Sequence, residues 1–375
     1  MSEDKNMNFS LTILPGIEDI AQREFEKKWK QLNTSELPTI QQKKGKLLVK
    51  AEVSDFCTLI PYLRIPTDAY VILEEFTGKD RPKIYNKISK IPWHNYLRGD
   101  FPLVLVTTKE SKIINSTLVK ESVESGIKLA LKKAPIKKVP KGKESISNKI
   151  HIDLYQDRLR VSLSLCGTRM DKRGIKLYTD VAPLRESIAA AMIFRLSELC
   201  TDQSLIDPMS GTGTFSLEAI LFNQYNSYRD FDYQLAPFFI SLPLRKRQKI
   251  EQNLFKTVST YDISPKSVES IKHNFKPFQG SFEEIKVQDF FKLDQISETV
   301  AAINPPYGKR IKLEQDLDIF VDKLITHAKE NIKLKKLALI FPTWAFHKLK
   351  NLKLEEKRFI TNGGIDVAFI IIDLS

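Results

Sequence analysis

The stretch SLIDPMSGTGTFSLEAI, residues 204–220, decides the fold of this 375-residue chain. It begins with the apolar strand Leu205–Asp207, passes through a glycine-rich turn and enters a helix at Phe215–Ile220. Gly211 and Gly213 allow positive φ angles and a close approach of the backbone to a ligand. The free N–H groups and the positive dipole end of the helix favour a carboxylate or a phosphate. The stretch therefore predicts a strand–turn–helix unit that holds an anion.

Strands and helices alternate on both sides of this unit. A long helix is predicted over Leu184–Cys200, and apolar strands recur in STYDIS, TVAAINPPYG and KLALIFPT. This alternation indicates a wound α/β sheet. Asn362-Gly363-Gly364 separates the last two apolar runs and is a hairpin signal, so the final strand is expected to be antiparallel. A mostly parallel seven-stranded sheet with an antiparallel last strand is the Rossmann-like layout of class I methyltransferases, unlike the all-parallel dinucleotide-binding fold.

A second motif, Asn304-Pro305-Pro306-Tyr307, follows the apolar strand Val300–Ile303. An exocyclic amino group of a nucleobase is a poor nucleophile because its lone pair is delocalised into the ring. The Asn304 side-chain oxygen and the Pro305 carbonyl, held rigidly by two prolines, would let that nitrogen pyramidalise towards a methyl donor. Tyr307 offers a flat face for a base turned out of its stack. The motif predicts methylation of a nucleobase amino group, with these four residues as the catalytic ones.

Two acids follow the next strands, Asp262 in STYDIS and Asp289 in VQDFF. In dinucleotide sites an acid about 20 residues past the glycine loop takes the ribose hydroxyls, and Asp262 lies much further from Asp207 than that. The excess chain, Tyr225–Arg247, is rich in aromatic residues and ends in a basic run. It fits an insertion at the rim of the site and additional packing equally well. Each acid could equally be a helix cap or a solvated loop acid.

The first 165 residues indicate a small α+β region. Apolar or alternating runs predict strands at Phe9–Gly16, Lys46–Val53, Val71–Gly78 and Pro102–Lys109, and a hairpin over Ile150–Leu165. Helical spacing predicts helices over Ile17–Lys30, near Asp55–Tyr62 and over Ser116–Leu131. This order favours a split β-α-β layout of the ferredoxin type.

The chain is basic, with 59 Lys and Arg against 46 Asp and Glu and a formal net charge of +13. Such an excess favours a polyanionic partner, although many basic proteins bind no nucleic acid. Residues 128–143 hold seven lysines and no acid. This run is either a solvated loop or an arm that contacts RNA phosphates through Lys132, Lys133, Lys137, Lys138, Lys141 and Lys143.

Other residue types narrow the class of protein. Cys57, Cys166 and Cys200 are widely spaced and the five histidines are scattered, so buried free thiols and no metal site are expected. No apolar run reaches the roughly 18 residues that cross a bilayer. The acidic start differs from the basic opening of a signal peptide. A cytoplasmic protein that is not bound to a membrane is expected.

Together these motifs resemble the THUMP-domain RNA methyltransferases, above all the bacterial group that methylates guanine N2 in 23S ribosomal RNA. LTILPGIEDIAQREF (11–25), DKRGI (171–175) and APLRESIAA (182–190) carry the resemblance, and the last two are the most diagnostic. The resemblance implies four segments: an N-terminal ferredoxin-like segment (1–65), a THUMP RNA-binding domain (66–166), a linker (167–183) and an S-adenosylmethionine-dependent methyltransferase domain (184–375).

The resemblance also implies the cofactor site. S-adenosylmethionine would be held by Arg185, by Asp262 at the ribose, by Asp289 at the adenine and by the glycine loop. The full set is Arg185, Asp207, Pro208, Met209, Ser210, Gly211, Thr212, Gly213, Asp262, Ile263, Asp289 and Phe290. The family more often has Cys-Gly-Ser-Gly where this chain has Ser210–Gly213, which is a mild change. A long insertion before Asp262 is usual in this group.

The leading hypothesis is a 23S rRNA guanine-N2 methyltransferase that acts on structured RNA. A tRNA guanine-N2 methyltransferase has the same order of domains and is the nearest alternative. A DNA adenine-N6 methyltransferase shares the logic of the Asn304 motif but does not predict the N-terminal half. A non-catalytic RNA-binding factor is opposed by the intact Asn304, Pro305, Pro306 and glycine pair.

Overall fold

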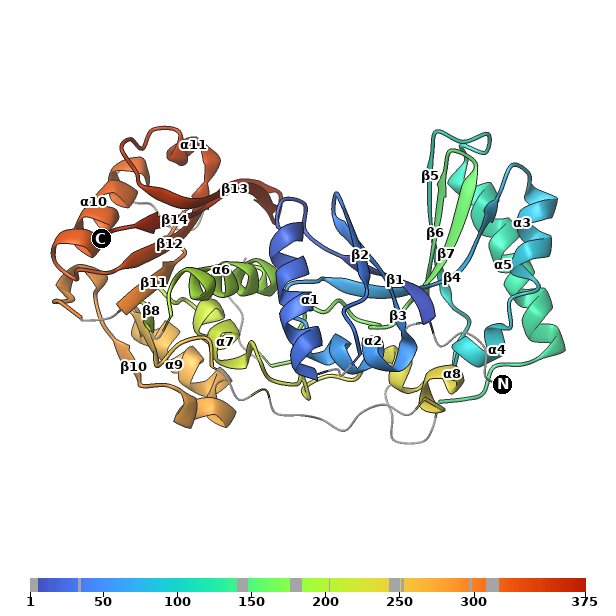
Figure 1. Cartoon of the computed structure of the whole chain (residues 1–375), viewed down its shortest axis with the longest axis horizontal. Coiled ribbons are helices and arrows are strands. Elements are labelled where there is room, and N and C mark those ends of the chain that lie inside the picture. Colours follow the sequence, from blue (N-terminus) through green and yellow to red (C-terminus); the bar gives the residue numbers. More distant parts are fainter. Residues whose placement is uncertain are drawn as a thin grey trace.

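The computed structural model describes residues 6–32, 35–139, 148–175, 184–201, 203–242, 250, 253–296, 299–307 and 317–375. These residues form two mixed sheets of seven strands each. Figure 1 shows the sheets next to each other along the long axis of the molecule, with α6 (Glu186–Leu199) between α1 (Glu18–Leu32) and the second sheet. No helix in this described part is both long and apolar enough to cross a membrane.

The first sheet has the order β2-β3-β1-β4-β7-β6-β5. All neighbouring pairs are antiparallel except β5 with β6. Its strands are β1 (Asn6–Thr12), β2 (Thr39–Lys43), β3 (Lys46–Glu52), β4 (Asp68–Thr77), β5 (Leu103–Lys109), β6 (Lys149–Tyr155) and β7 (Arg158–Ser164). One row of register partners crosses all seven strands: Ile40, Val49, Phe9, Val71, Leu163, Ile150 and Val104.

Helices cover the face on which this apolar row lies. Six of the seven side chains in the row are buried, because alternate residues of a strand point to the same face and this face meets the helices. The helices of this half are α1, α2 (Val53–Leu59), α3 (Arg81–Ile88), α4 (Trp93–Tyr96) and α5 (Ser116–Lys133), with the 3-10 turn η1 (Ile60–Tyr62) after α2. The apolar core of the first sheet lies on this face, and the opposite face carries polar residues such as Ser10, Tyr70 and Ser164.

The predicted elements of this half are present with small shifts of their ends. The hairpin of β6 and β7 turns at Gln156 and Asp157, whose φ angles of 48° and 59° suit a tight two-residue turn. The polar strand β2 and the short helices α3 and α4 were not predicted. Their sequences are too short or too polar to show a period.

The second sheet has the order β10-β9-β8-β11-β12-β14-β13. Its strands are β8 (Ser204–Asp207), β9 (Val258–Asp262), β10 (Glu284–Val287), β11 (Thr299–Ile303), β12 (Lys336–Pro342), β13 (Leu354–Asn362) and β14 (Ile365–Asp373). The pairs from β10 to β12 are parallel, and β14 lies antiparallel between β12 and β13. This confirms the predicted class I methyltransferase sheet with its antiparallel last strand.

The strand order of the second sheet reverses between β8 and β11. In open α/β sheets the carboxyl ends of the strands at such a point form the usual ligand site. The helices of this half are α6, α7 (Thr214–Leu221), α8 (Pro237–Ile240), α9 (Pro265–Asn274), α10 (Leu317–Glu330) and α11 (Thr343–Phe346). Short 3-10 turns lie at η2 (Asp232–Gln234), η3 (Lys276–Ser281) and η4 (Phe290–Lys292).

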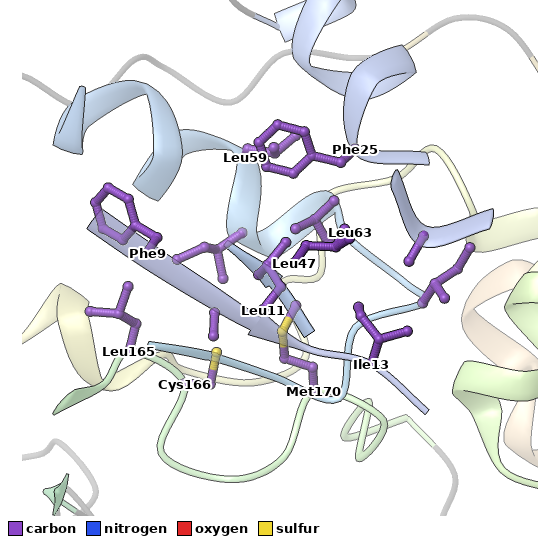
Figure 2. Packing of buried hydrophobic residues seen from close by; sticks show 14 of the residues in the cluster. Phe9, Leu11, Ile13, Phe25, Leu47, Leu59, Leu63, Leu165, Cys166 and Met170 are labelled. Carbon is purple, nitrogen blue, oxygen red and sulfur yellow. The ribbon is translucent and has the colours of Figure 1, made fainter. Parts of the chain in front are cut away.

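The chain that leaves β7 packs into the core of the first sheet. Figure 2 shows Leu165, Cys166 and Met170 beside Phe9 and Leu11 of β1. Residues 167–175, the described part of the predicted linker, thus follow the N-terminal core closely, and residues 176–183 lie outside the described residues. All three cysteines are buried and free, as predicted.

The insertion before β9 packs against the N-terminal half. The Asn226 backbone N–H donates to the Pro61 carbonyl over 2.9 Å, and the Tyr233 hydroxyl donates to the Cys57 carbonyl over 2.9 Å. The Phe238 ring lies 5.3 Å from that of Tyr96. The described part of the insertion therefore joins the two halves, and its basic run at 245–247 lies outside the described residues.

Candidate active site at the carboxyl edge of the second sheet

The glycine loop begins at Asp207, the last residue of β8. Asp207 is 1% exposed, and its Oδ2 accepts from the Ser216 backbone N–H over 3.2 Å and from the Ser216 hydroxyl over 2.9 Å. The Thr260 hydroxyl donates to Ser216 Oγ over 2.6 Å. Asp207 thus fixes the first turn of α7 to the end of its own strand. The loop between them has little freedom.

Asp262, the last residue of β9, holds the loop from the neighbouring strand. Its Oδ2 accepts from the Gly211 N–H over 2.8 Å and its Oδ1 from the Ser264 N–H over 2.9 Å. The Ser210 hydroxyl donates to the Tyr261 carbonyl over 2.8 Å. The sequence predicts Asp262 near the loop. It does not predict that the Asp262 carboxylate accepts a hydrogen bond from the loop backbone itself.

Gly211 and Gly213 both have positive φ angles, of 54° and 73°. A Cβ added at Gly213 would lie 2.5 Å from the Phe275 ring, so this position excludes any side chain. A Cβ at Gly211 would meet no described atom within 4 Å. Gly213 is therefore required by packing, whereas Gly211 faces open space where a ligand can approach the backbone.

Asn304 follows β11, the strand that pairs with β8. Its Oδ1 is buried and has no hydrogen-bond partner among the described residues. Pro305 is buried, and Pro306 and Tyr307 are partly buried. Tyr307 and Met209, one from each sequence motif, pack against the same core cluster. The predicted stacking of a base on Tyr307 stays a prediction.

The residues after β10 are arranged differently from the prediction in one respect. Asp289 does not end the strand, which stops at Val287; its Oδ1 instead accepts from the Phe291 N–H over 3.0 Å and caps η4. The Phe290 side chain is 2% exposed and lies 5.2 Å from the His327 ring. Ile263, by contrast, is 68% exposed.

The remaining predicted residues are Arg185 and the lysines. Arg185 is the N-cap residue of α6 and is partly buried. Lys132 and Lys133 end α5, and they are exposed together with Lys137 and Lys138. Figure 1 shows α5 at the opposite end of the molecule from β11. Lys141 and Lys143 lie outside the described residues.

Two residues at the carboxyl end of β12 were missed by the sequence reasoning. The Thr343 hydroxyl is buried without a partner among the described residues, and Trp344 is 56% exposed, with Lys348 Nζ 5.7 Å from its ring. Because β12 pairs with β11, both residues are candidates for contact with a base near Asn304. Both residues directly follow the apolar run KLALIFP. That position after a strand was the sequence feature that could have identified them.

The donor set at this edge consists of carboxylates, one carboxamide, hydroxyls and backbone groups. Over the described ranges, no group of three or more His, Cys, Asp or Glu side chains is placed to hold a metal ion. The arrangement combines a loop that can bind an anion with an amide oxygen just after the adjacent strand that no described residue satisfies. Such an edge can position a donor and accept hydrogen bonds from an amino group.

Comparison with known proteins points to methyl transfer. A family model described as RMKL-like, methyltransferase domain, matches residues 173–368, just over half of the chain. YpsC of Bacillus subtilis (strain 168), whose name refers to RNA methylation, is 24% identical over 344 residues and 86% of each chain. The tRNA (guanine(6)-N2)-methyltransferase of Methanocaldococcus jannaschii is 24% identical over 86% of this chain and 87% of its own.

A further relative is the ribosomal RNA large subunit methyltransferase K/L of Vibrio parahaemolyticus. It is 26% identical over 66% of this chain, but the match spans only 37% of the relative. Among solved structures, a possible methylase from Clostridium difficile 630 has a TM-score of 0.74 at 20% identity, and SMU.472 complexed with SAH has 0.73 at 22% identity. Each covers 98% of both chains, and at these identities the likeness concerns the fold.

Proposed function

This chain belongs to the RMKL-like methyltransferase domain family, and on that premise we propose that it methylates the exocyclic N2 of a guanine in structured RNA, with S-adenosylmethionine as the methyl donor. The observation that carries the proposal is the buried Oδ1 of Asn304, which has no hydrogen-bond partner among the described residues. An unsatisfied buried acceptor costs about 1–3 kcal/mol. A substrate amino group is a donor that would satisfy it.

The residues of the glycine loop fit the proposed cofactor. Gly211 leaves open space beside a backbone with positive φ, and the first turn of α7 offers N–H groups for a carboxylate. We assign Arg185, Asp207–Gly213, Asp262, Ile263, Asp289 and Phe290 to this cofactor. When bound, S-adenosylmethionine supplies an electrophilic methyl group.

Asn304 and Pro305 would activate the acceptor nitrogen. If the Asn304 Oδ1 and the Pro305 carbonyl both accept from the guanine amino group, the nitrogen lone pair is drawn out of conjugation with the ring. Tyr307 would support the base from one face. No strong base is required, because the amino proton becomes acidic only as the new N–C bond forms. Catalysis then rests on positioning and on fixed acceptors.

The N-terminal half would bind the RNA. We propose the division 1–65, 66–166, 167–183 and 184–375, with the second segment as a THUMP domain and the third as a linker. The exposed Lys132, Lys133, Lys137 and Lys138 would contact phosphates without reading sequence. This surface and the Asn304 motif would then act on one RNA molecule.

The relatives suggest two kinds of RNA as the substrate. Ribosomal RNA of the large subunit is our first candidate, because the family model takes its description from the K/L group. The observation that favours tRNA is the match to the tRNA (guanine(6)-N2)-methyltransferase over 87% of that relative, against 37% of the K/L enzyme.

Methyl transfer to three nucleic acids in parallel separates these candidates. The full chain and labelled S-adenosylmethionine are incubated with 23S rRNA, tRNA and duplex DNA that lack modifications, and the products are digested and identified by nucleoside mass spectrometry. N2-methylguanosine from either RNA is expected. N6-methyladenosine in DNA, or no transfer to any of them, contradicts the proposal.

A further inference from the structure

Helix α7 follows the glycine loop. Near its carboxyl end, side-chain cations from the N-terminal half donate hydrogen bonds to backbone carbonyls. Lys28 Nζ of α1 donates to the Phe222 carbonyl over 2.7 Å, and the Arg64 guanidinium donates to the Gln224 carbonyl over 2.9 Å. Phe222 is the C-cap residue of α7. The last carbonyls of a helix lack partners within it and carry its negative dipole end, so cations stabilise them.

The middle of α7 is held by the segment that leaves the first sheet. Arg173 donates to Glu218 over 3.0 and 3.1 Å, and the two side chains are 3% and 1% exposed. The same guanidinium donates to the Met170 carbonyl over 2.7 Å and to the Arg64 carbonyl over 2.5 Å. Arg173 therefore connects α7 to two places in the N-terminal half.

Lys28 is itself held in a closed network. Its Nζ lies 2.6 Å from Glu24 Oε1 and 2.6 Å from the Tyr62 carbonyl, and 3.8 Å from the centroid of the Phe222 ring. Glu24 also accepts from the backbone N–H groups of Arg64 and Ile65. The three N–H donors of the ammonium group are thus all hydrogen-bonded, and one of these bonds goes to the Phe222 carbonyl at the end of α7.

Charges at this depth are costly. Burial lowers the pKa of Lys28 to about 8, although the attraction of Glu24 opposes this, and burial together with nearby Arg173 lowers the pKa of Arg64 to about 10. Apolar residues of similar size often make an interface of equal stability at lower cost. Two buried cations bond to α7 and its C-cap, and Arg64 bonds to Gln224 two residues past the C-cap. This arrangement indicates that the exact placement of the helix matters, beyond adhesion between the halves.

The other end of α7 carries the loop. Ser216 in its first turn is bound to Asp207, and Gly213 is its N-cap residue. A helix of eight residues is about 12 Å long and moves as one unit. A shift imposed at Phe222 or Glu218 is therefore passed to Gly211 and Gly213.

We propose that Lys28, Arg64 and Arg173 are positioning residues that hold the cofactor loop through α7, so that the N-terminal half contributes to cofactor affinity as well as to RNA binding. The proposal rests on the assignment of the glycine loop to the cofactor. On this proposal, the cofactor loop and the RNA-binding N-terminal half are energetically coupled through α7.

The test measures S-adenosylhomocysteine binding to full-length variants by calorimetry. The double variant Arg173→Met/Glu218→Met removes the contact without leaving a lone buried charge. The matched control is Arg358→Met, which breaks the ion pair of Arg358 with Asp19 between the same two halves but does not touch α7. Melting temperatures of all variants report their folding.

The double variant is expected to raise the Kd for S-adenosylhomocysteine about 10-fold, a coupling of ordinary size. In turnover it should raise KM for S-adenosylmethionine while KM for RNA and kcat at saturating cofactor stay within about 2-fold. Arg173→Lys, which keeps the charge, should recover part of the affinity. The control should bind as the wild type does.

Two results overturn the proposal and tell its parts apart. If Gly211→Ala leaves S-adenosylhomocysteine binding unchanged, the loop is not the cofactor site and its assignment fails. If Gly211→Ala weakens binding but the folded double variant binds with wild-type affinity, the loop assignment stands and the coupling through α7 is wrong. A fall in melting temperature alone, with unchanged affinity, has the same meaning as the second result.

Discussion

Asn304 carries a buried amide oxygen that no described residue satisfies, whereas both carboxylate oxygens of Asp262, two strands away, are bonded to backbone N–H groups. The proposal assigns the first oxygen to a substrate amino group, whereas the Asp262 carboxylate binds the loop backbone. The place of Asn304 at the end of an apolar strand could be predicted because it depends on adjacent residues, and its catalytic role stays a prediction. The bond of Asp262 to Gly211 could not be predicted, because the two residues meet only through the pairing of β8 with β9.

The buried Lys28 predicts how the free energy of unfolding depends on pH. Burial lowers its pKa to about 8 from the ordinary 10.5, and the charged groups around it are Glu24, Arg64 and Arg173. Between these two pH values the folded protein binds fewer protons at this site than the unfolded chain. The contribution of Lys28 to the free energy of unfolding therefore rises with pH, by at most about 1.4 kcal/mol per pH unit.

Urea unfolding of the wild type and of Lys28→Met, at several pH values from about 7 to 10, measures this contribution. The difference between the two proteins should grow in favour of the wild type above about pH 8. Lys30→Met, at an exposed position on α1, should show no such trend. A difference that is flat or shrinks with pH contradicts the burial of a charged Lys28.

Among the elements, those with a strong local signal were predicted well. The Gly363-Gly364 turn of the last hairpin, the amphipathic α5 and the apolar strands of the second sheet all appear near their predicted ends. The role of the insertion could not be predicted, because it lies in contacts such as Tyr233 with Cys57 that join residues far apart in sequence. Its aromatic residues are explained by packing between the two halves.

The end of α5 carries the prediction for RNA binding. Lys132 and Lys133 are exposed in its last turn and free of acidic neighbours in sequence. Replacing both by Gln should weaken RNA binding uniformly across sequences and reduce the salt dependence of the affinity by about two counterions. Filter binding or fluorescence anisotropy at several salt concentrations gives both quantities.

The double variant Lys30→Gln/Lys329→Gln is the matched control, because it removes two exposed lysines from α1 and α10. It should change the affinity far less. Equal losses in the two double variants would mean that the charge of the whole protein, and no particular surface, attracts RNA.

For the whole molecule, the class I sheet and the methyltransferase assignment followed from the sequence, but the connection between the halves did not. Nothing local in the sequence marks Lys28, Arg64 and Arg173 as buried, and only the folded chain places them at α7 and the residues that follow it. Their placement depends on two separate sheets coming together. On the functions proposed above, RNA binding, cofactor binding and methyl transfer all depend on the assembly of the two halves.

Asn304 is proposed to activate a nucleobase amino group, and the rate of methyl transfer by Asn304→Ala measures that role. Transfer to RNA should fall by about 100-fold or more, because an acceptor that acts in the transition state is lost. Binding of S-adenosylhomocysteine and of RNA should stay within about 3-fold of the wild type. Asn86→Ala, at an exposed position of α3, should have wild-type activity. Near-full methyl transfer by a folded Asn304→Ala protein would contradict the account.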